Sequence, residues 1–199
     1  MISSEFCAGR AVEEVFDAAV AAGIRLIQLR EKHADGGRLY ELARHCRPIA
    51  DRAGALLIID DHVDVALAAG ADGVHLGQDD LPAAAARRIA PELFIGVSTH
   101  NLSEAVAARD SGASYYNIGP IYPTGTKSLP MAPLGIGAIS EISPRIDLPF
   151  SVMGGIKLRH IPELRAAGAR VLAMVTEITA APDVGAKCAE LLTACGVKP

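Results

Sequence analysis

The amino-acid sequence predicts an α/β fold in which eight βα units close into a barrel, and three observations support this. First, half of the 199 residues are hydrophobic but only 4% are aromatic, which suits Ala-rich helices packed over a parallel sheet. Second, short β-branched runs alternate with amphipathic stretches from residue 10 to the end, without a linker. We therefore expect residues 1–199 to form a single (β/α)₈ TIM-barrel domain.

The third observation is a glycine junction that recurs along the chain. Each copy ends a helix with a glycine, which fits the left-handed position there, and then starts a strand with apolar residues. The copies are Ala22–Leu26, Ala69–Val74, Ser111–Tyr115 and Ala167–Val171. Counted from a first strand near residue 1, they precede the second, fourth, sixth and eighth strands. An open doubly wound sheet is the competitor, but no G-x-G-x-x-G follows the first strand.

Seven strands can be placed from the apolar runs. They are Leu26–Arg30, Leu56–Ile59, Gly73–Leu76, Phe94–Ser98, Tyr115–Ile118, Phe150–Met153 and Val171–Val175. The first strand of the barrel is different, because only Met1-Ile2-Ser3 precede a polar pair and the helix that begins near Arg10. We expect that strand to be truncated or very short, which would leave the barrel with a less protected edge.

Charge and composition narrow the class of partner. The net charge is −4 and the basic residues are scattered, so neither nucleic acid nor an anionic membrane is expected as a partner. No apolar run reaches the length of about 18 residues that spans a membrane, and no signal peptide is evident. The four cysteines form no C-x-x-C pair and read as free thiols of a cytoplasmic protein. Small phosphorylated molecules are the expected partners, and a homodimer stays open.

Cationic side chains follow the strand that begins at Leu26. In an extended chain Gln28, Arg30 and Lys32 point to one side, at the end of the strand where such barrels carry their chemistry. Arg grips phosphate oxygens in a fork and Lys adds a mobile charge, so the three residues suit a diphosphate. The alternative is an ordinary strand end with solvated charges.

Acidic clusters follow the next two strands. Asp60-Asp61-His62 and Gln78-Asp79-Asp80 fall on neighbouring loops, and Mg²⁺ prefers one or two carboxylates together with substrate phosphates. Asp61 and Asp80 are the candidate ligands. Helix capping is the alternative, by Asp79 or Asp80 at one helix and by Asp64 at the other.

Further polar or glycine-containing segments follow the later strands. Ser98 is expected to donate or accept a hydrogen bond at the substrate, since no nucleophile pattern surrounds it. His75 is interpreted as a core histidine. The long loop with Thr124, Thr126 and Lys127 is typical of an anion-binding flap, with a merely flexible loop as the alternative. Phosphate is also expected where barrels of this class bind it, at Gly154-Gly155 and Val175-Thr176.

Taken together and in order, these motifs resemble those of the thiamine-phosphate synthase family. They are Q-L-R-E-K from Gln28, V-D-V-A-L-A-x-G-A-D-G-V-H-L-G-Q-D-D-L from Val63, G-V-S-T-H-N from Gly96, G-P-I-Y-P-T-x-T-K from Gly119 and G-G-I from Gly154. The match covers nearly the whole chain. The stretch 63–81 and the Pro-Thr-Gly-Thr-Lys loop are its most specific parts.

The resemblance implies a Mg²⁺-dependent transferase, in which a thiazole phosphate displaces diphosphate from hydroxymethylpyrimidine diphosphate to give thiamine phosphate. The dissociative step needs stabilisation and positioning more than proton transfer, and the resemblance implies that this falls to Arg30, Lys32, Lys127 and Ser98. It assigns the pyrimidine diphosphate to Gln28, Leu29, Arg30, Glu31, Lys32, Asp60, Ser98 and Lys127. It assigns the thiazole phosphate to Thr124, Gly125, Thr126, Gly155, Val175 and Thr176. It assigns Mg²⁺ to Asp61 and Asp80.

Asp60 departs from the family pattern, which usually reads Asn-Asp-Arg where this chain has Asp-Asp-His. An added carboxylate near a diphosphate costs ~1 kcal/mol at 4 Å in water and more when buried, unless it is protonated or bound to a metal ion. It could weaken the pyrimidine site or recruit a second cation. Thr176 stands for a usual Ser and keeps the hydroxyl, and Met153 stands for a smaller aliphatic residue.

Two rival functions remain open from the sequence. A thiazole tautomerase would share the barrel and the thiazole-phosphate site, but such proteins tend to lose the Gln-Asp-Asp segment and carry a His after the sixth strand. Here Gln78 to Asp80 is intact and Pro120 follows Gly119. A non-catalytic thiazole-phosphate-binding barrel is the second rival, and the retained Arg30, Lys32 and Lys127 speak against it.

Overall fold

The structure is a computed structural model that describes residues 1–126 and 131–197. The chain divides into two compact units, which we call unit 1 (Met1–His75 with Val175–Pro199) and unit 2 (Leu76–Met174). Each unit combines parallel strands with helices, which confirms the predicted α/β class. That residues 1–199 form a single domain stays a prediction.

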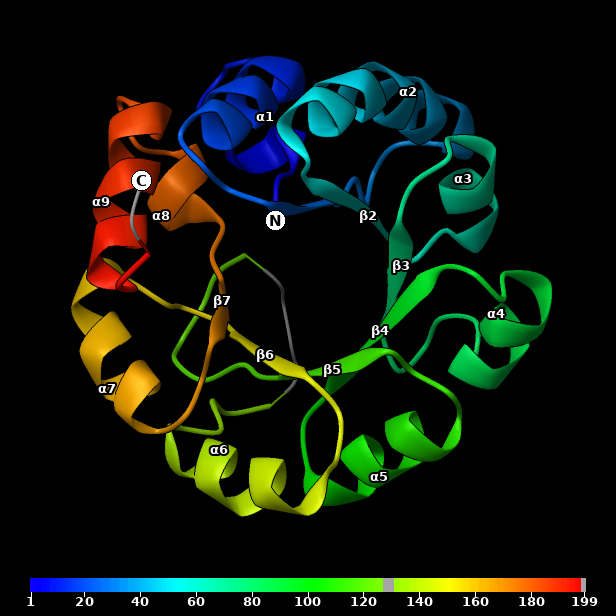
Figure 1. Ribbon diagram of the computed structural model, residues 1–199, viewed down its shortest axis with the longest axis vertical. Coiled ribbons are helices and arrows are strands. Elements are labelled where there is room, and N and C mark those ends of the chain that lie inside the picture. The colour runs from blue at the N-terminus through cyan, green and yellow to red at the C-terminus, as the bar shows by residue number, and fades with distance from the viewer. Residues whose placement is uncertain (127–130, 198–199) are drawn as a thin grey trace. The chain divides into compact units, whose positions relative to one another are not determined.

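Unit 1 contains three strands in the order β1-β2-β3, paired in parallel. Figure 1 shows helices α1, α2 and α3 on one face of these strands, with α9 beside α1. The elements are the 3₁₀ turn η1 (Ser4–Phe6), α1 (Val12–Ala21), β1 (Leu26–Leu29), α2 (Gly36–Ala53), β2 (Leu56–Asp60), α3 (Val63–Ala68), β3 (Gly73–Leu76), α8 (Thr176–Thr179) and α9 (Val184–Ala194).

The expected first strand is reduced to one residue. Ile2 makes an isolated parallel bridge to Leu29, in which its N–H donates to the Gln28 carbonyl at 2.8 Å and its carbonyl accepts from the Arg30 N–H at 2.9 Å. Ser4 already begins η1, so no further strand bonds form. The bridge gives β1 a hydrogen-bonded neighbour on its other side, and that Ile2 stands for the first strand of a barrel stays a prediction.

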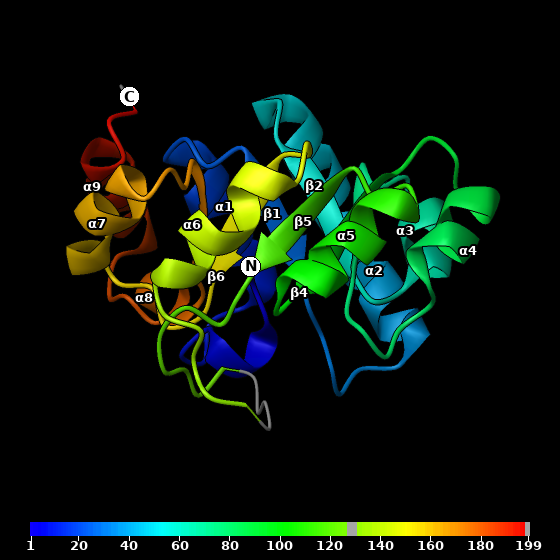
Figure 2. The ribbon, with the colours of Figure 1, turned by 90° about the horizontal axis from the view of Figure 1, so that it is seen from below.

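Unit 2 contains four strands in the order β4-β5-β6-β7, paired in parallel. The turned view shows α5 lying along β4 and β5 (Figure 2). The elements are α4 (Ala83–Ile89), β4 (Phe94–Thr99), α5 (Leu102–Asp110), β5 (Tyr115–Ile118), α6 (Gly137–Ile142), the 3₁₀ turn η2 (Ser143–Arg145), β6 (Phe150–Met153), the 3₁₀ turn η3 (Leu158–His160), α7 (Ile161–Ala166) and β7 (Val171–Ala173).

All four predicted glycine junctions are present with one geometry. Gly23, Gly70, Gly112 and Gly168 have positive φ values of 108°, 62°, 81° and 97°. In each, the residue after the glycine donates to a carbonyl five residues earlier, for example Ala71 N–H to Ala66 at 2.9 Å and Ala169 N–H to Leu164 at 3.0 Å. This pattern closes the last helical turn and releases the chain into the next strand.

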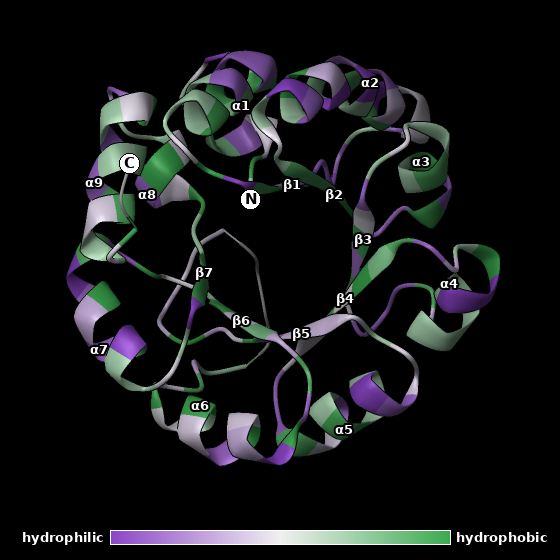
Figure 3. Ribbon diagram, in the orientation of Figure 1, coloured by the Kyte–Doolittle hydropathy of each residue, from purple (hydrophilic) through white to green (hydrophobic). Residues whose placement is uncertain are grey.

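Both units bury apolar strand and helix faces. Figure 3 shows hydrophobic colour on strands such as β4 and β6 and hydrophilic colour on outward helix faces such as that of α2. Leu57 and Ile59 of β2 and Ile118 of β5 are fully buried. Burying one such side chain contributes about 1.5–3 kcal/mol, so these positions tie the strand ends to a rigid core.

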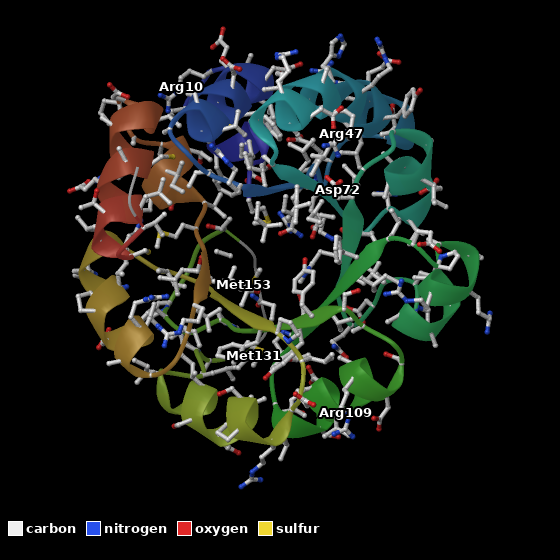
Figure 4. All side chains as sticks on the ribbon, viewed as in Figure 1. Arg10, Arg47, Asp72, Arg109, Met131 and Met153 are labelled. Atoms are coloured by element: carbon white, nitrogen blue, oxygen red, sulfur yellow. The ribbon has the colours of Figure 1, made fainter. Side chains whose placement is uncertain are left out.

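An ion pair fixes the start of β2. Arg47 of α2 pairs with Asp72 at 2.6 Å, and the same carboxylate oxygen accepts from the Leu57 N–H at 2.7 Å. Figure 4 labels Arg47 and Asp72, which lie close together between α2 and the strands of unit 1. One carboxylate thereby joins a helix, a glycine junction and a strand.

Two predicted strand ends are too long. β1 ends at Leu29 and not at Arg30, and β7 ends at Ala173 and not at Val175. At β7 the reason is local, because α8 begins at Thr176 and Val175 must turn, with φ −120° and ψ −90°. In the part of the chain that the structure describes, no helix is long and apolar enough to cross a membrane.

Candidate active site

The carboxyl ends of β1 and β2, in unit 1, bring Arg30 and Gln28 onto one carboxylate. The Arg30 Nε lies 3.1 Å from one oxygen of Asp60, and the Gln28 amide donates to the other oxygen at 2.5 Å. Arg30 and Asp60 are only 8% and 7% exposed. Both carboxylate oxygens are therefore engaged by protein groups in a buried setting, which holds the Arg30 side chain in one place.

This pairing answers the question that Asp60 raised. A buried carboxylate without a partner would be costly, but the guanidinium of Arg30 compensates its charge. The repulsion expected between Asp60 and a diphosphate is reduced by the same pairing. Asp60 also neutralises part of the positive charge of Arg30. The attraction between Arg30 and a bound anion is therefore weaker than that of an unpaired guanidinium.

A second pair lies just beyond the ends of the two strands, between Lys32 and Asp61. The Lys32 ammonium pairs with the Asp61 carboxylate, and the lysine side chain is 37% exposed. Asp61 has a φ of 67°, in the left-handed region that is uncommon for residues other than glycine. Its N–H donates to the His75 carbonyl at 2.8 Å. Such local strain clusters at functional sites, and here it presents a candidate metal ligand beside a candidate phosphate ligand.

The alternation of side chains along residues 28–32 is confirmed. Gln28, Arg30 and Lys32 all contact the acidic pair, which is Asp60 and Asp61. By contrast, Leu29 is fully buried. Glu31 accepts from the Ser4 N–H and from the Ser4 hydroxyl, each at 2.6 Å. Substrate contacts of Leu29 and Glu31 stay predictions that would rest on their backbone atoms. These bonds show that ordinary solvated charges do not describe this strand end.

His75 is buried at 4% exposure on β3, which agrees with its interpretation as a core histidine. It is the register partner of Asp60 in the pairing of β2 with β3. It therefore lies at the level of the acidic pair, although the sequence suggested no role for it there.

Helix capping does not explain the acidic residues of either loop. The Asp80 carboxylate accepts from the Gly77 N–H at 2.7 Å, and α4 begins after Pro82 without a side-chain cap. α3 begins after His62, also without a side-chain cap, and Asp64 lies inside its first turn. The capping alternative is thus wrong, and Asp80 instead closes the tight turn after β3. In the same turn the Gln78 amide donates to the Ser98 carbonyl at 2.6 Å.

A row of buried polar side chains crosses unit 2, and sequence reasoning predicted its Ser98 but missed Asn117 and Ser151. Ser98 of β4 is the register partner of Asn117 of β5, which in turn is the partner of Ser151 of β6. The Asn117 amide donates to the Ser151 hydroxyl at 2.7 Å, and all three residues are buried. The signal was present in the sequence as single polar residues inside the apolar runs Y-Y-N-I and F-S-V-M.

The loop after β5 is anchored at its base. The N–H groups of Ile121 and Tyr122 donate to the carbonyls of Met153 and Gly154 at 2.8 and 3.0 Å. Within the loop the Thr126 N–H donates to the Thr124 hydroxyl at 3.2 Å. The bonds of Ile121 and Tyr122 tie the base of the loop to the end of β6. Lys127, a predicted catalytic residue, lies outside the described residues.

The Gly154-Gly155 pair is required by packing. A Cβ on Gly154 would lie 2.5 Å from the Cα of Pro120, and one on Gly155 would lie 2.3 Å from the Pro123 carbonyl oxygen. Their φ values are 96° and 63°. The sequence interpretation gave these glycines to phosphate approach. The structure adds a nearer reason, because both let the loop after β5 lie directly on the end of β6.

Val175 and Thr176 lie in unit 1, at the start of α8, with both residues partly exposed. α8 has only four residues, so its dipole is too short to carry a phosphate site by itself. The predicted phosphate contacts of these two residues stay predictions.

The donor set for Mg²⁺ is chemically suitable. Asp61 and Asp80 supply hard carboxylate oxygens, which is the usual protein contribution when substrate phosphates complete the coordination. Among residues 1–126 and 131–197 no group of three His, Cys, Asp or Glu side chains is placed to hold a metal ion. Binding of Mg²⁺ by Asp61 and Asp80 stays a prediction.

Comparisons with known proteins agree with one another. Residues 1–178 match the model of the family described as thiamine monophosphate synthase. The thiamine-phosphate synthase of Shouchella clausii is 43% identical over 191 residues, which are 96% of this chain and 91% of that protein. The thiamine-phosphate synthase of Chloroflexus aurantiacus is 43% identical over 183 residues, which are 92% of this chain and 85% of that protein.

A solved structure gives the same result. The structure of thiamine phosphate pyrophosphorylase from Pyrococcus furiosus superposes with a TM-score of 0.90 at 32% identity. The alignment covers 98% of this chain and 93% of that one.

Proposed function

The chain belongs to the thiamine monophosphate synthase family, a family of transferases in thiamine biosynthesis, and we propose that its own reaction is Mg²⁺-dependent and dissociative. The bond between the pyrimidine methylene carbon and the diphosphate oxygen breaks, and its electron pair leaves with the diphosphate. The ring nitrogen of the thiazole phosphate then forms the new bond to that carbon. No proton has to move in this step.

The observation that carries the proposal is the pairing of Arg30 and Lys32 with Asp60 and Asp61 in unit 1. Arg30 is held in place by Asp60 and would bind the diphosphate as a fixed donor. Lys32 is more exposed and would bind it as a mobile charge. Such preorganised cations act where negative charge develops, which is the largest requirement of this step.

Mg²⁺ would be held by Asp61 and Asp80 and, when bound, neutralises charge on the departing diphosphate. Asp61 pairs with Lys32 in the structure, and engagement of the Asp61 carboxylate by a metal ion would leave the Lys32 ammonium available to the diphosphate. The hydroxyl of Ser98 and Lys127 are proposed to orient the pyrimidine diphosphate, as the resemblance implies. Thr124, Gly125, Thr126, Gly155, Val175 and Thr176 are proposed to hold the thiazole phosphate.

We also propose that the fold is a closed eight-unit barrel. The Ile2 bridge to Leu29 would then stand for its first strand, and the 0.90 TM-score with the P. furiosus protein supports this. Small phosphorylated substrates fit such a fold. The described cysteines are free thiols, three of them buried, which fits work in a reducing compartment such as the cytoplasm.

The test is direct. Purified protein is mixed with hydroxymethylpyrimidine diphosphate and hydroxyethylthiazole phosphate, and thiamine phosphate and diphosphate are followed with Mg²⁺ and with a chelator. Product that needs Mg²⁺ is expected. Thiazole phosphate binding without product would favour the tautomerase-like or non-catalytic alternative, and product that is unchanged by the chelator would overturn the metal dependence.

A further inference from the structure

We propose that three side chains, those of Tyr122, His160 and Glu163, position the thiazole-phosphate site. We call these three side chains the latch. Tyr122 is then a positioning residue for the reaction, acting through Thr124 and Gly155. This inference rests on the proposed function, because it takes those two residues as thiazole-phosphate ligands.

The contacts of Tyr122 join the loop after β5 to the segment after β6. The Tyr122 hydroxyl donates to a carboxylate oxygen of Glu163, in the first turn of α7, at 2.5 Å. Its ring stacks on the imidazole of His160, with ring centroids 3.9 Å apart and planes 20° from parallel. One side chain is thus held both at its face and at its end, which leaves little freedom for its backbone.

His160 is itself fixed. The Lys157 N–H donates to the His160 Nδ1 at 3.1 Å, so the imidazole accepts through this nitrogen and caps the η3 turn. Because His160 directly precedes α7, the surface against which Tyr122 stacks is continuous with the helix that carries Glu163. The base of the latch is therefore one rigid piece.

The latch is coupled to the predicted phosphate ligands through the backbone. Tyr122 donates from its N–H to the Gly154 carbonyl at 3.0 Å, and a Cβ on Gly155 would lie 2.9 Å from the Tyr122 Cβ. Thr124 follows two residues later and already bonds to the Thr126 N–H. A shift of the Tyr122 side chain would therefore be felt at Gly155 and at the hydroxyl of Thr124.

The latch contributes more to position than to stability. The Tyr122–Glu163 bond is exposed, and exposed charged pairs and hydrogen bonds contribute little to the free energy of unfolding. Burial and the Glu163 carboxylate raise the pKa of Tyr122 to about 12, so the phenol remains a proton donor at every working pH. A phosphate ligand displaced by a fraction of an ångström nevertheless loses affinity, because such hydrogen bonds are directional.

The experiment compares Y122F and E163A with E163Q, which keeps a neutral acceptor for the Tyr122 hydroxyl. Calorimetry measures the Kd of hydroxyethylthiazole phosphate, and kinetics give KM for each substrate. We expect Y122F and E163A to raise Kd and KM for the thiazole phosphate by about fivefold, and E163Q to recover most of this loss. KM for the pyrimidine diphosphate should stay within about twofold of wild type. Y40F on α2 and E141Q on α6 are the matched controls and should change neither value.

The outcomes separate the latch from the proposed function. Unchanged thiazole-phosphate affinity in Y122F and E163A, or an equal loss for both substrates, overturns the latch. Wild-type protein that binds the thiazole phosphate but forms no product overturns the proposed function, while the binding data still test the latch. Wild-type protein that does not bind the thiazole phosphate overturns both. Thermal unfolding of each variant identifies a misfolded one. If Y122F or E163A is misfolded, E163Q provides the test. An unchanged Kd in E163Q then supports retention of the Tyr122 hydrogen bond, and an increase above fivefold overturns the latch.

Discussion

Two regions that we propose to bind phosphorylated substrates are built in different ways. They are the carboxyl ends of β1 and β2 in unit 1, and the end of β6 with the loop after β5 in unit 2. The first region uses charge, because Arg30 and Lys32 are each paired with a carboxylate. The second region uses shape, because Gly154 and Gly155 let the backbone of the loop lie within contact distance. The polar side chains of residues 119–126 are the hydroxyls of Tyr122, Thr124 and Thr126.

The difference teaches where substitutions should act. In unit 1 a change at a paired charge alters the electrostatics of the site while the strand positions are held by the core. In unit 2 a change at a glycine displaces the loop itself, so folding and site geometry are lost together. Four predictions break or sharpen this contrast.

The largest expected effect comes from Gly154→Ala. The new methyl group would lie 2.5 Å from two Pro120 carbon atoms, and the φ of 96° is strained for alanine. We expect a loss of about 3 kcal/mol or more in the free energy of unfolding, measured by urea denaturation. Gly168→Ala is a matched control, since its φ is 97° but nothing lies within 4 Å of its Cβ. It should lose only about 1–2 kcal/mol.

Equal losses in the two alanine variants would contradict the role of close packing. They would show that the left-handed backbone alone makes glycine necessary at the end of β6. Close packing of the loop would then no longer distinguish this region from the charged region.

The second prediction addresses the charged region. Asp61→Asn removes both the partner of Lys32 and a proposed Mg²⁺ ligand. We expect turnover to fall by at least about 10-fold, equivalent to about 1.4 kcal/mol, with little change in thermal unfolding. Asp64→Asn, on the exposed side of α3, is the control and should keep wild-type rates. A near-normal rate for Asp61→Asn, across a range of Mg²⁺ concentrations, would remove Asp61 from the site.

Much of this contrast could be predicted from the sequence, because two of its patterns are strong: the repeated glycine junction and the alternation of side chains along residues 28–32. The glycine junctions and the alternation of residues 28–32 are local patterns, and both were confirmed. The pairing of Arg30 with Asp60 could not be predicted, because it depends on the register of β1 against β2, in which Gln28 faces Ile58. The same holds for the Ser98–Asn117–Ser151 row, where three strands must align before the polar residues form a group.

The role of Gly154 and Gly155 could be predicted only in part. A Gly-Gly pair after a strand indicates close approach of some group, but the sequence does not say which group approaches. Only the path of the loop after β5 shows that Pro120 and Pro123 are that group. The capping alternative for Asp80 failed for a related reason. The Asp80 carboxylate accepts from the Gly77 N–H and is therefore not used to cap α4, whose N-cap residue is Pro82.

The third prediction sharpens the charge argument. Asp60→Asn keeps one acceptor oxygen for Arg30, and its new NH2 group can donate to the Gln28 amide oxygen once that amide turns over. The negative charge is removed, so the full charge of Arg30 becomes available to the diphosphate. We expect KM for the pyrimidine diphosphate to fall by about two- to fivefold, equivalent to about 0.4–1 kcal/mol, the size of one Coulomb interaction across about 4 Å of water. Steady-state kinetics at saturating thiazole phosphate measure it. A large loss of activity would instead give the Asp60 carboxylate a task of its own, such as binding a second cation.

The smallest expected effect concerns Tyr116 of β5, whose hydroxyl is buried without a hydrogen-bond partner among the described residues. Burial raises the pKa of this phenol to about 12, and its ring packs near Phe150 with centroids 5.8 Å apart. Tyr116→Phe removes a desolvated hydroxyl and keeps the ring, so the free energy of unfolding should rise by up to about 1 kcal/mol. Tyr40→Phe on α2 is the control and should change nothing. A loss of stability or of turnover in Tyr116→Phe would mean that the hydroxyl has a partner in the working protein, and unit 2 would then depend on more than shape.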